Sequence, residues 1–324
     1  MNGNKSVWIS SLDKYVPVFL MILLMAVLTI SNRNFLSGQS IFNLLQQVSA
    51  LGIVAFGAMI VLLTAGIDFT AGFGLSLAGV TAGYVYLESG NNGIVLILTA
   101  LLVGAAIGFI NGAIIVKLNL NPFITTLAMM SICKGVSMLV SEGRQVTITT
   151  NYLLSLGSGR ILSCIPVSFV VFMIAVILMH IIMNKTKLGI YTYAMGGNED
   201  AVVYSGINKG RYKILVYTAA GICYGLAAVI TCAQVTVITS NISGDYLLDG
   251  IAAAVIGGTG LQGGKGTVFG VTIGAFIITL ITTILNFLQV PYLFREVIKG
   301  LIIMGILLFD IVVSKTTARM RVTE

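Results

Sequence analysis

Long apolar runs separated by short polar breaks dominate the pattern along this chain. Many runs approach 20 residues, the length at which a helix crosses the roughly 30 Å hydrocarbon core of a bilayer. The ten-residue alternating segments of a membrane barrel do not recur. The expected spans are Tyr15 to Ile30, Asn43 to Thr64, Asp68 to Leu87, Ile94 to Val116, Phe123 to Val140, Ile165 to Met183, Ile214 to Ala233, Tyr246 to Gly258, Thr267 to Leu288 and Glu296 to Val313. The pattern predicts an all-α integral membrane protein of about ten transmembrane helices, with residues 1–324 as one transmembrane domain.

Two of these spans are interrupted by glycine. The third opens with GIDFTAGFGLSLAG, and the eighth runs from Tyr246 into GGTGLQGGKG and is too short to cross as one straight helix. Paired broken segments favour a solute path, although glycines also serve close helix packing, and both interpretations stay open. The two halves are too dissimilar to establish an inverted repeat. The candidate path residues are Asp68, Phe69, Lys134, Tyr246, Asp249 and Gly250.

The longest clearly polar stretch runs from Asn184 to Lys213. A short helix is expected inside it, because Asn198 can cap the first free N–H groups and acidic residues suit the positive end of a helix dipole. Gly206 supplies a stop. Two turns would be marginal alone in water, so this helix is expected to lie against another surface. Its residues are Gly197, Asn198, Glu199, Asp200, Ala201, Val202, Val203, Tyr204, Ser205 and Gly206.

Composition supports the membrane assignment and adds an orientation. The chain is 57% hydrophobic and 9% charged, against about a quarter charged in soluble domains. The net charge of +7 is spread over breaks between spans, which does not resemble a nucleic-acid surface. With the N-terminus inside, the cytoplasmic segments carry Lys5, Lys14, Lys117, Lys185, Lys187, Lys209, Arg211, Lys213, Lys265, Lys315, Arg319 and Arg321, and the outer segments carry Arg33, Arg144, Arg160 and Arg295. The positive-inside rule therefore predicts that both termini and the 184–213 loop are cytoplasmic.

Charged residues inside the spans are candidates for function, because they are costly in lipid. Lys134 lies near the middle of the fifth span and Asp68 begins the third. An ion pair between them would lower both costs, although Asp68 could instead be hydrated at an interface. Glu296 and Lys299 are expected to form a simple i,i+3 pair.

Near the start of the eighth span, Asp245 and Asp249 flank Tyr246, and these carboxylates with an aromatic ring could contact a polyol. Helix capping is the commoner use of Asp.

Enzymatic chemistry is not indicated. The Walker pattern ending on Gly264-Lys265 would need glycine at Thr259 and a hydroxyl at Gly266, so it fails. The G-x-G-x-x-G match from Gly258 has no βαβ context. No nucleophile and base constellation and no metal-ligand spacing occurs. No catalytic residue, metal or directly bound cofactor is therefore expected.

Four segments carry a family resemblance. LLTAGIDFTAGFGLSLAG, NPFITTLAMMSICKG, YTYAMGGNEDAVVYSGIN and LDGIAAAVIGGTGLQGGKGTVFG, in this order, resemble the permease subunits of bacterial ribose-type ABC importers, the ribose, xylose and arabinose group in particular. The resemblance extends from the second span to the last. It implies a monosaccharide permease in a bacterial cytoplasmic membrane, paired with a second permease copy, a cytoplasmic ATPase that holds the ATP, and an extracytoplasmic sugar-binding protein.

The resemblance also implies that Gly197 to Gly206 is the helix that docks on the ATPase. The familiar coupling motif E-A-A-x-x-x-G reads here as Glu199, Asp200 and Ala201, with glycine one place late at Gly206. Two alternatives remain: the same importer class with another cargo, such as an autoinducer-type furanose, a nucleoside or a branched-chain amino acid, and an ion-coupled secondary transporter or channel using Asp68 and Lys134.

Overall fold

The computed structural model describes residues 17–30, 34–161, 164–242, 246–291 and 294–305. Within these ranges, seven helical segments are long and apolar enough to cross a membrane. They are α2 (Gly38–Leu62), η1 with α3 (Phe69–Ala71, Phe73–Glu88), α4 (Gly93–Lys117), α5 (Pro122–Ser141), α7 (Val167–Lys185), α10 (Lys209–Val235) and α12 (Val268–Phe287). Shorter apolar helices are Pro17–Ile30 and α11 (Tyr246–Ile256), and residues 294–305 are also helical. The multi-pass all-α fold is confirmed; the total of ten stays a prediction, because parts of the first and last expected spans lie outside the described residues.

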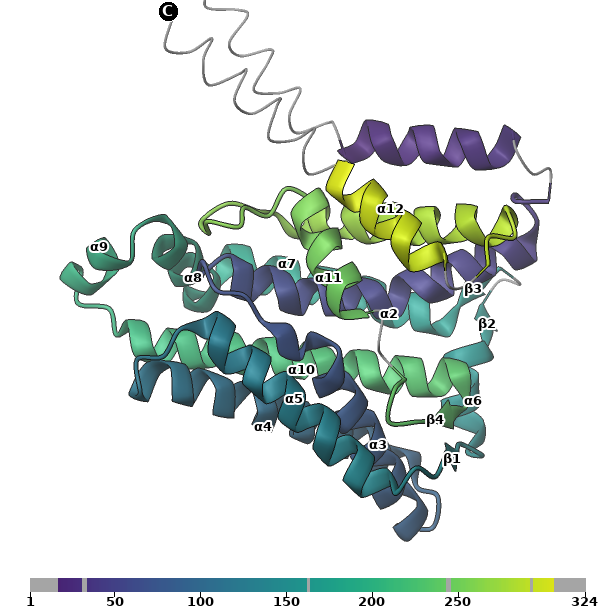
Figure 1. The fold of residues 1–324 in the computed structure, drawn as a ribbon, viewed down its shortest axis with the longest axis horizontal. Coiled ribbons are helices and arrows are strands. Elements are labelled where there is room, and N and C mark those ends of the chain that lie inside the picture. The colour runs from purple at the N-terminus through teal and green to yellow at the C-terminus, as the bar shows by residue number, and fades with distance from the viewer. Residues whose placement is uncertain (1–16, 31–33, 162–163, 243–245, 292–293, 306–324) are drawn as a thin grey trace, which may run out of the picture.

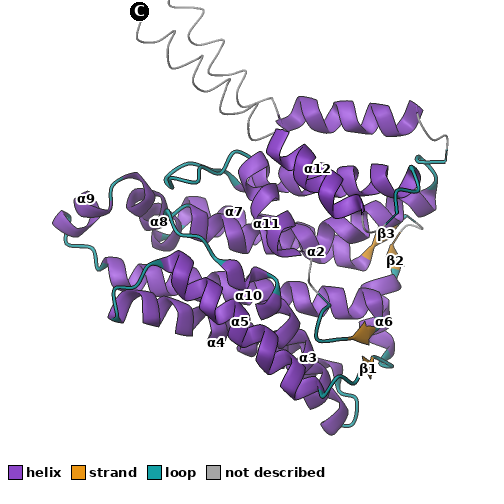
Figure 2. Ribbon diagram, viewed as in Figure 1, coloured by secondary structure: helices purple, strands orange, loops and turns teal. Residues whose placement is uncertain are grey.

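The two ends of the helical bundle differ (Figure 1). One end carries α8 (Lys187–Gly197) and α9 (Glu199–Tyr204), a pair of short helices. The other end carries α6 (Asn151–Ser158) and the four short strands shown in orange in Figure 2. Strand β1 (Val146–Thr147) pairs antiparallel with β4 (Val237–Ile238), and β2 (Arg160–Ile161) pairs antiparallel with β3 (Ile165–Pro166). The polar segments therefore gather at opposite ends and leave the apolar helices between them.

Helix α2 forms the centre of the bundle. It packs against α10, α11, α12 and α7, and every residue from Val48 to Leu62 is buried. A helix that is apolar on all sides is stable only where protein covers it on all sides. The other helices are consequently arranged around α2.

Glycines bring α4 and α10 into close antiparallel contact. A Cβ added to Gly108 would lie 2.1 Å from the carbonyl oxygen of Tyr217, and one added to Gly104 would lie 2.3 Å from that of Gly221. Lipid gives apolar helices no hydrophobic reason to associate, so small residues that let backbones approach closely determine which pairs form. The α4–α10 pair is such a contact.

The structure confirms that both spans are broken and that glycines pack helices closely there, while the solute path stays a prediction. In the third, Asp68 caps the 3-10 turn η1 through a hydrogen bond from the Thr70 backbone N–H (2.9 Å), and Gly72 separates that turn from α3. In the eighth, α11 has 11 residues, which span only about 16 Å. A loop with left-handed glycines follows, and the N–H of Gly264 there donates to the carbonyl oxygen of Leu63 at 3.0 Å. Glycine also packs helix on helix here, because a Cβ on Gly274 would lie 1.9 Å from the Ala253 carbonyl oxygen.

We expect Gly108→Ala to destabilise the protein by about 1–3 kcal/mol, the usual cost of overpacking, because its methyl group would collide with the backbone of α10. Thermal unfolding in detergent micelles measures the effect. Gly135→Ala is the matched control: it lies inside α5 with open space where its Cβ would be, so its midpoint should stay level or rise slightly. Equal midpoints for the two variants would contradict the packing role.

Candidate functional site

Helix α9 projects from one end of the bundle (Figure 1). The side chain of Asn198 accepts a hydrogen bond from the N–H of Ala201 at 3.0 Å, and Gly206 (φ +74°) ends the helix by donating to Val203 while Ile207 donates to Val202. This is a Schellman-type ending with glycine in the left-handed position. The predicted helix, its cap and its stop are therefore confirmed, although its role stays a prediction.

The apolar residues of α9 are mostly uncovered. Val202 is buried, whereas the side chains of Val203 and Tyr204 are 44% and 89% exposed. Little of these two side chains is buried within the chain, so they form a small apolar surface at the tip of the bundle.

Ion pairs fasten α9 to the start of α10. The carboxylate of Glu199 lies 3.2 Å from Lys209 Nζ and 3.6 Å from Lys213 Nζ. Burial acts to raise the pKa of Glu199, but Lys213 and Lys209 outweigh it and hold the pKa below its usual range. The carboxylate is therefore charged at neutral pH and orients α9 through both lysines.

Helix α8, which the sequence pattern did not predict, directly precedes α9 and connects it to the bundle (Figure 1). Thr186 caps it, and Gly196 approaches the bundle so closely that a Cβ there would lie 1.8 Å from the Leu63 carbonyl oxygen. Tyr193 donates to the carbonyl oxygen of Gly266 at 2.9 Å. The glycine loop after α11 and the α8–α9 unit are thus in contact. This contact links the end of the bundle that carries α9 directly to the broken eighth span.

A cavity of about 360 Å³ lies deeper in the bundle, among α2, α11, α12 and residues 294–305. Its inner wall includes the buried Asp249, Thr279 and Lys299 (8%, 2% and 6% exposed). Its outer wall includes Gln47, Asn241 and Asn286, which are exposed. Asn241 shortly follows β4, and Asn286 is in the last turn of α12, so the exposed rim faces the end opposite α9.

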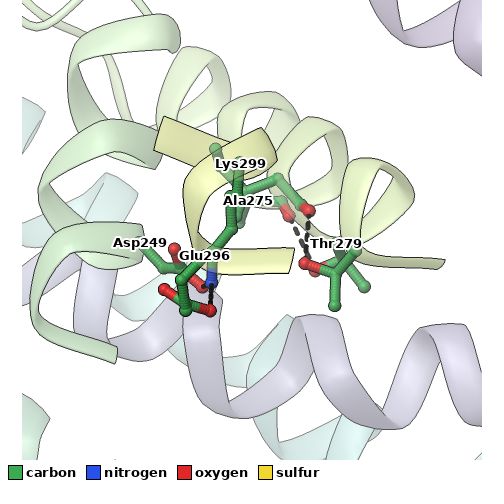
Figure 3. Close-up of polar contacts among 7 residues, drawn as sticks. Asp249, Ala275, Thr279, Glu296 and Lys299 are labelled. Atoms are coloured by element: carbon green, nitrogen blue, oxygen red, sulfur yellow. Dashed lines mark hydrogen bonds and ion pairs between the residues drawn. The ribbon is translucent and has the colours of Figure 1, made fainter. Parts of the chain in front are cut away.

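Three charged side chains meet at the inner wall (Figure 3). Lys299 Nζ lies 3.0 Å from Asp249 Oδ2 and 2.9 Å from Glu296 Oε1. The i,i+3 pair expected for Glu296 and Lys299 is confirmed, and Asp249 from α11 joins it. This triad ties the short helix α11 to the helix over residues 294–305. The sequence did not predict the contact between Asp249 and Lys299, because the two residues are 50 positions apart in the chain.

The predicted path residues fall in different places. Tyr246 and Asp249 line the cavity, whereas Gly250 packs against Val54 of α2, where an added Cβ would lie 2.7 Å from the side chain. Phe69 contacts the ring of Phe123, with centroids 5.2 Å apart.

The hypothesis of an Asp68–Lys134 ion pair is wrong for this conformation. Asp68 is buried and bonded to Thr70. Lys134 is exposed on α5, where its Nζ lies 5.2 Å from the centroid of the Phe73 ring. Asp68 therefore serves its own 3-10 turn, a local capping interaction that competes with any distant cation. The ion-coupled alternative loses the structural pair on which it rested.

The structure describes a multi-helix membrane protein with two broken segments, and sequence comparison identifies its family. Residues 40–307 match the family described as branched-chain amino acid transport system / permease component, and the chain belongs to that family. The family's description is that of the permease component of a transport system.

Individual relatives are similar over almost their whole length. The ribose import permease RbsC of Escherichia coli K12 is 38% identical, over 90% of this chain and 91% of the relative. RbsC of Bacillus subtilis strain 168 is 36% identical, over 92% and 93%. The galactose/methyl galactoside import permease MglC of E. coli K12 is 32% identical, over 95% and 96%. No solved structure matches the chain.

We expect Lys299→Met to destabilise the protein by about 3–5 kcal/mol, because it removes the cation that lies between two carboxylates at a buried site. The double variant Asp249→Asn/Lys299→Met should recover much of this loss. Denaturant titration in micelles measures the free energy of unfolding of the wild type and of each variant. As a control, Arg144→Ala breaks the exposed Glu142–Arg144 pair and should cost less than about 1 kcal/mol. A double variant no more stable than Lys299→Met would refute the coupling.

We expect Glu199→Gln to loosen α9 at pH 7, seen as faster amide hydrogen exchange at residues 199–206. The folded-state pKa of Glu199 is depressed, so its contribution is present above the ordinary carboxyl pKa and is lost as pH falls through the lower folded value. The difference between the two proteins should therefore vanish in acid. Asp200→Asn, on the same turn, is the control. Identical exchange at neutral pH would show that the two lysines do not hold α9.

Proposed function

We propose that this chain is the membrane-spanning permease of an ATP-driven importer that passes a monosaccharide, ribose or a close relative, from an extracytoplasmic binding protein to the cytoplasm. The observation that carries the proposal is a capped helix with exposed Val203 and Tyr204 on a chain of this family. The names of the relatives, which concern ribose, allose and galactose, support a sugar as cargo.

In this proposal the end that carries α9 faces the cytoplasm. The described lysines and arginines of that end are Lys117, Lys185, Lys187, Lys209, Arg211, Lys213 and Lys265, and those near the opposite end are Arg144, Arg160 and Arg295. The excess supports an N-in and C-in chain in a bacterial cytoplasmic membrane. Residues 184–213 then form the cytoplasmic coupling loop of a single permease domain.

The partner at that end is a cytoplasmic ATPase, which binds the ATP; this chain itself binds no cofactor. Val203 and Tyr204 give the ATPase a small apolar contact, and the capped ends of α9 hold the contact in place. A second permease copy and the sugar-binding protein complete the complex. Which sugar is carried depends largely on the binding protein.

The contacts within the chain offer a route for coupling. Closure of the ATPase on ATP would move α9, which Glu199 ties to α10. Helix α8, which precedes α9, contacts the glycine loop after α11 through Tyr193 and Gly196. Motion at the cytoplasmic end would thereby reach α11 and η1, the two broken segments, and open the path to one side at a time.

We expect Val203→Asp to uncouple the complex: sugar-stimulated ATPase activity in proteoliposomes should fall at least about tenfold, because a charge replaces the apolar contact and has to be desolvated. Gly206→Pro should act similarly by removing the left-handed helix ending. Val203→Ala is the control and should keep most of the activity. Normal assembly together with normal coupling in Val203→Asp would contradict the docking proposal. Because Val203 is exposed, this substitution leaves the packed core of the chain intact.

A further inference from the structure

The cavity beneath α11 has the chemistry of a site for a neutral, hydroxyl-rich molecule. Its volume of about 360 Å³ falls within the usual range for small-molecule pockets. Apart from Leu51, Ile242 and Leu285, its lining side chains are polar. Because the rim is exposed, water can occupy the cavity, and a hydroxyl-rich solute can replace that water at the same polar groups.

The charges around the cavity cancel. Lys299 and Arg295 contribute two cations, and Asp249 and Glu296 contribute two carboxylates. Each charge is engaged within the wall: Lys299 contacts both carboxylates, and Arg295 donates to the Val290 carbonyl oxygen (2.7 Å) and to Asn286 Oδ1. No net charge remains to attract an ionic solute, so the recognition elements are hydrogen-bonding groups.

Those groups suit sugar hydroxyls, which both donate and accept. The side-chain amides of Gln47 and Asn241 provide donors and acceptors. Thr282 and Thr279 donate their hydroxyl hydrogens to the carbonyl oxygens of Ile278 and Ala275, so both hydroxyl oxygens keep lone pairs that can accept a hydrogen bond. Tyr246 adds a ring and a phenol at the wall formed by α11.

We propose that this cavity is a transit site that holds one monosaccharide inside each permease chain, with Gln47 and Thr282 bonding to its hydroxyls. The inference rests on the proposed function and deepens it, because it places solute contact within the chain, on the side of α11 that faces α2 and α12. The exposed rim then accepts the sugar from the end opposite α9. The Asp249–Lys299 pair closes the inner wall.

The test uses the complete importer in proteoliposomes, with D-ribose as the probe. We expect Thr282→Val, which keeps the side-chain shape and removes the hydroxyl, to raise the KM for ribose uptake about two- to tenfold, the loss typical of one hydrogen bond. Gln47→Leu should act in the same direction. Thr272→Val is the matched control, since it changes the same residue type on the same helix outside the cavity and should leave KM unchanged.

A labelling experiment keeps the proposal testable if a variant assembles poorly. In a Cys164→Ser background, which removes the exposed natural thiol, Gln47→Cys should react with a maleimide more slowly during turnover with D-ribose. D-ribose 5-phosphate should give no protection, because the cavity offers its charge no free cation.

The outcomes separate the two proposals. A wild-type complex that imports neither ribose, allose nor galactose would overturn the proposed function itself. A complex that imports ribose, with unchanged KM in both cavity variants and no protection of Gln47→Cys, would overturn the transit site alone. Equal protection by the phosphorylated sugar would overturn recognition of a neutral polyol.

Discussion

A backbone amide or carbonyl that faces hydrocarbon without a partner costs several kcal/mol, so irregular chain inside a membrane survives only where protein or water surrounds it. This constraint organises the whole structure. The breaks at η1 and after α11 both lie against α2, the helix that protein covers most completely. Asp68 caps one break, and the carbonyl oxygen of Leu63, just beyond α2, accepts from the other.

Polar side chains inside the bundle obey the same rule, because each of them needs a partner within the protein. Asp249 and Lys299 are tolerable because they neutralise each other, and Glu296 extends the pair toward the exposed rim. The cavity next to them is bounded by hydroxyls and amides, groups that an uncharged solute can satisfy. A buried ion pair is weak evidence for stability in itself, but here it joins a half-length helix, α11, to the last described helix.

The end of the bundle that carries α9 is not subject to this constraint, because water is available there to bond with the backbone. Helix α9 needs no tertiary cover for its backbone, since Asn198 and Gly206 close its two ends. Glu199 fixes its direction by ion pairs that are only partly buried, as the proposed movement of α9 with a partner would require. Tyr193 and Gly196 connect the α8–α9 unit to the glycine loop, so the proposed coupling surface and the broken helix share one local structure.

The sequence by itself determined the helical membrane fold, the position of the two breaks, and α9 with its cap and stop, because each depends on residues close together in the chain. Run length predicts a span, and Asn198 and Gly206 act within one or two turns. Only the tertiary structure decided that Asp68 bonds to Thr70 and not to Lys134, and that Asp249 pairs with Lys299. Helix rotation determines which side chains meet across the bundle, and an apolar sequence with little amphipathic contrast leaves that rotation unspecified. Contacts such as those of Gly108 with Tyr217 supply it, and they exist only once the helices have packed.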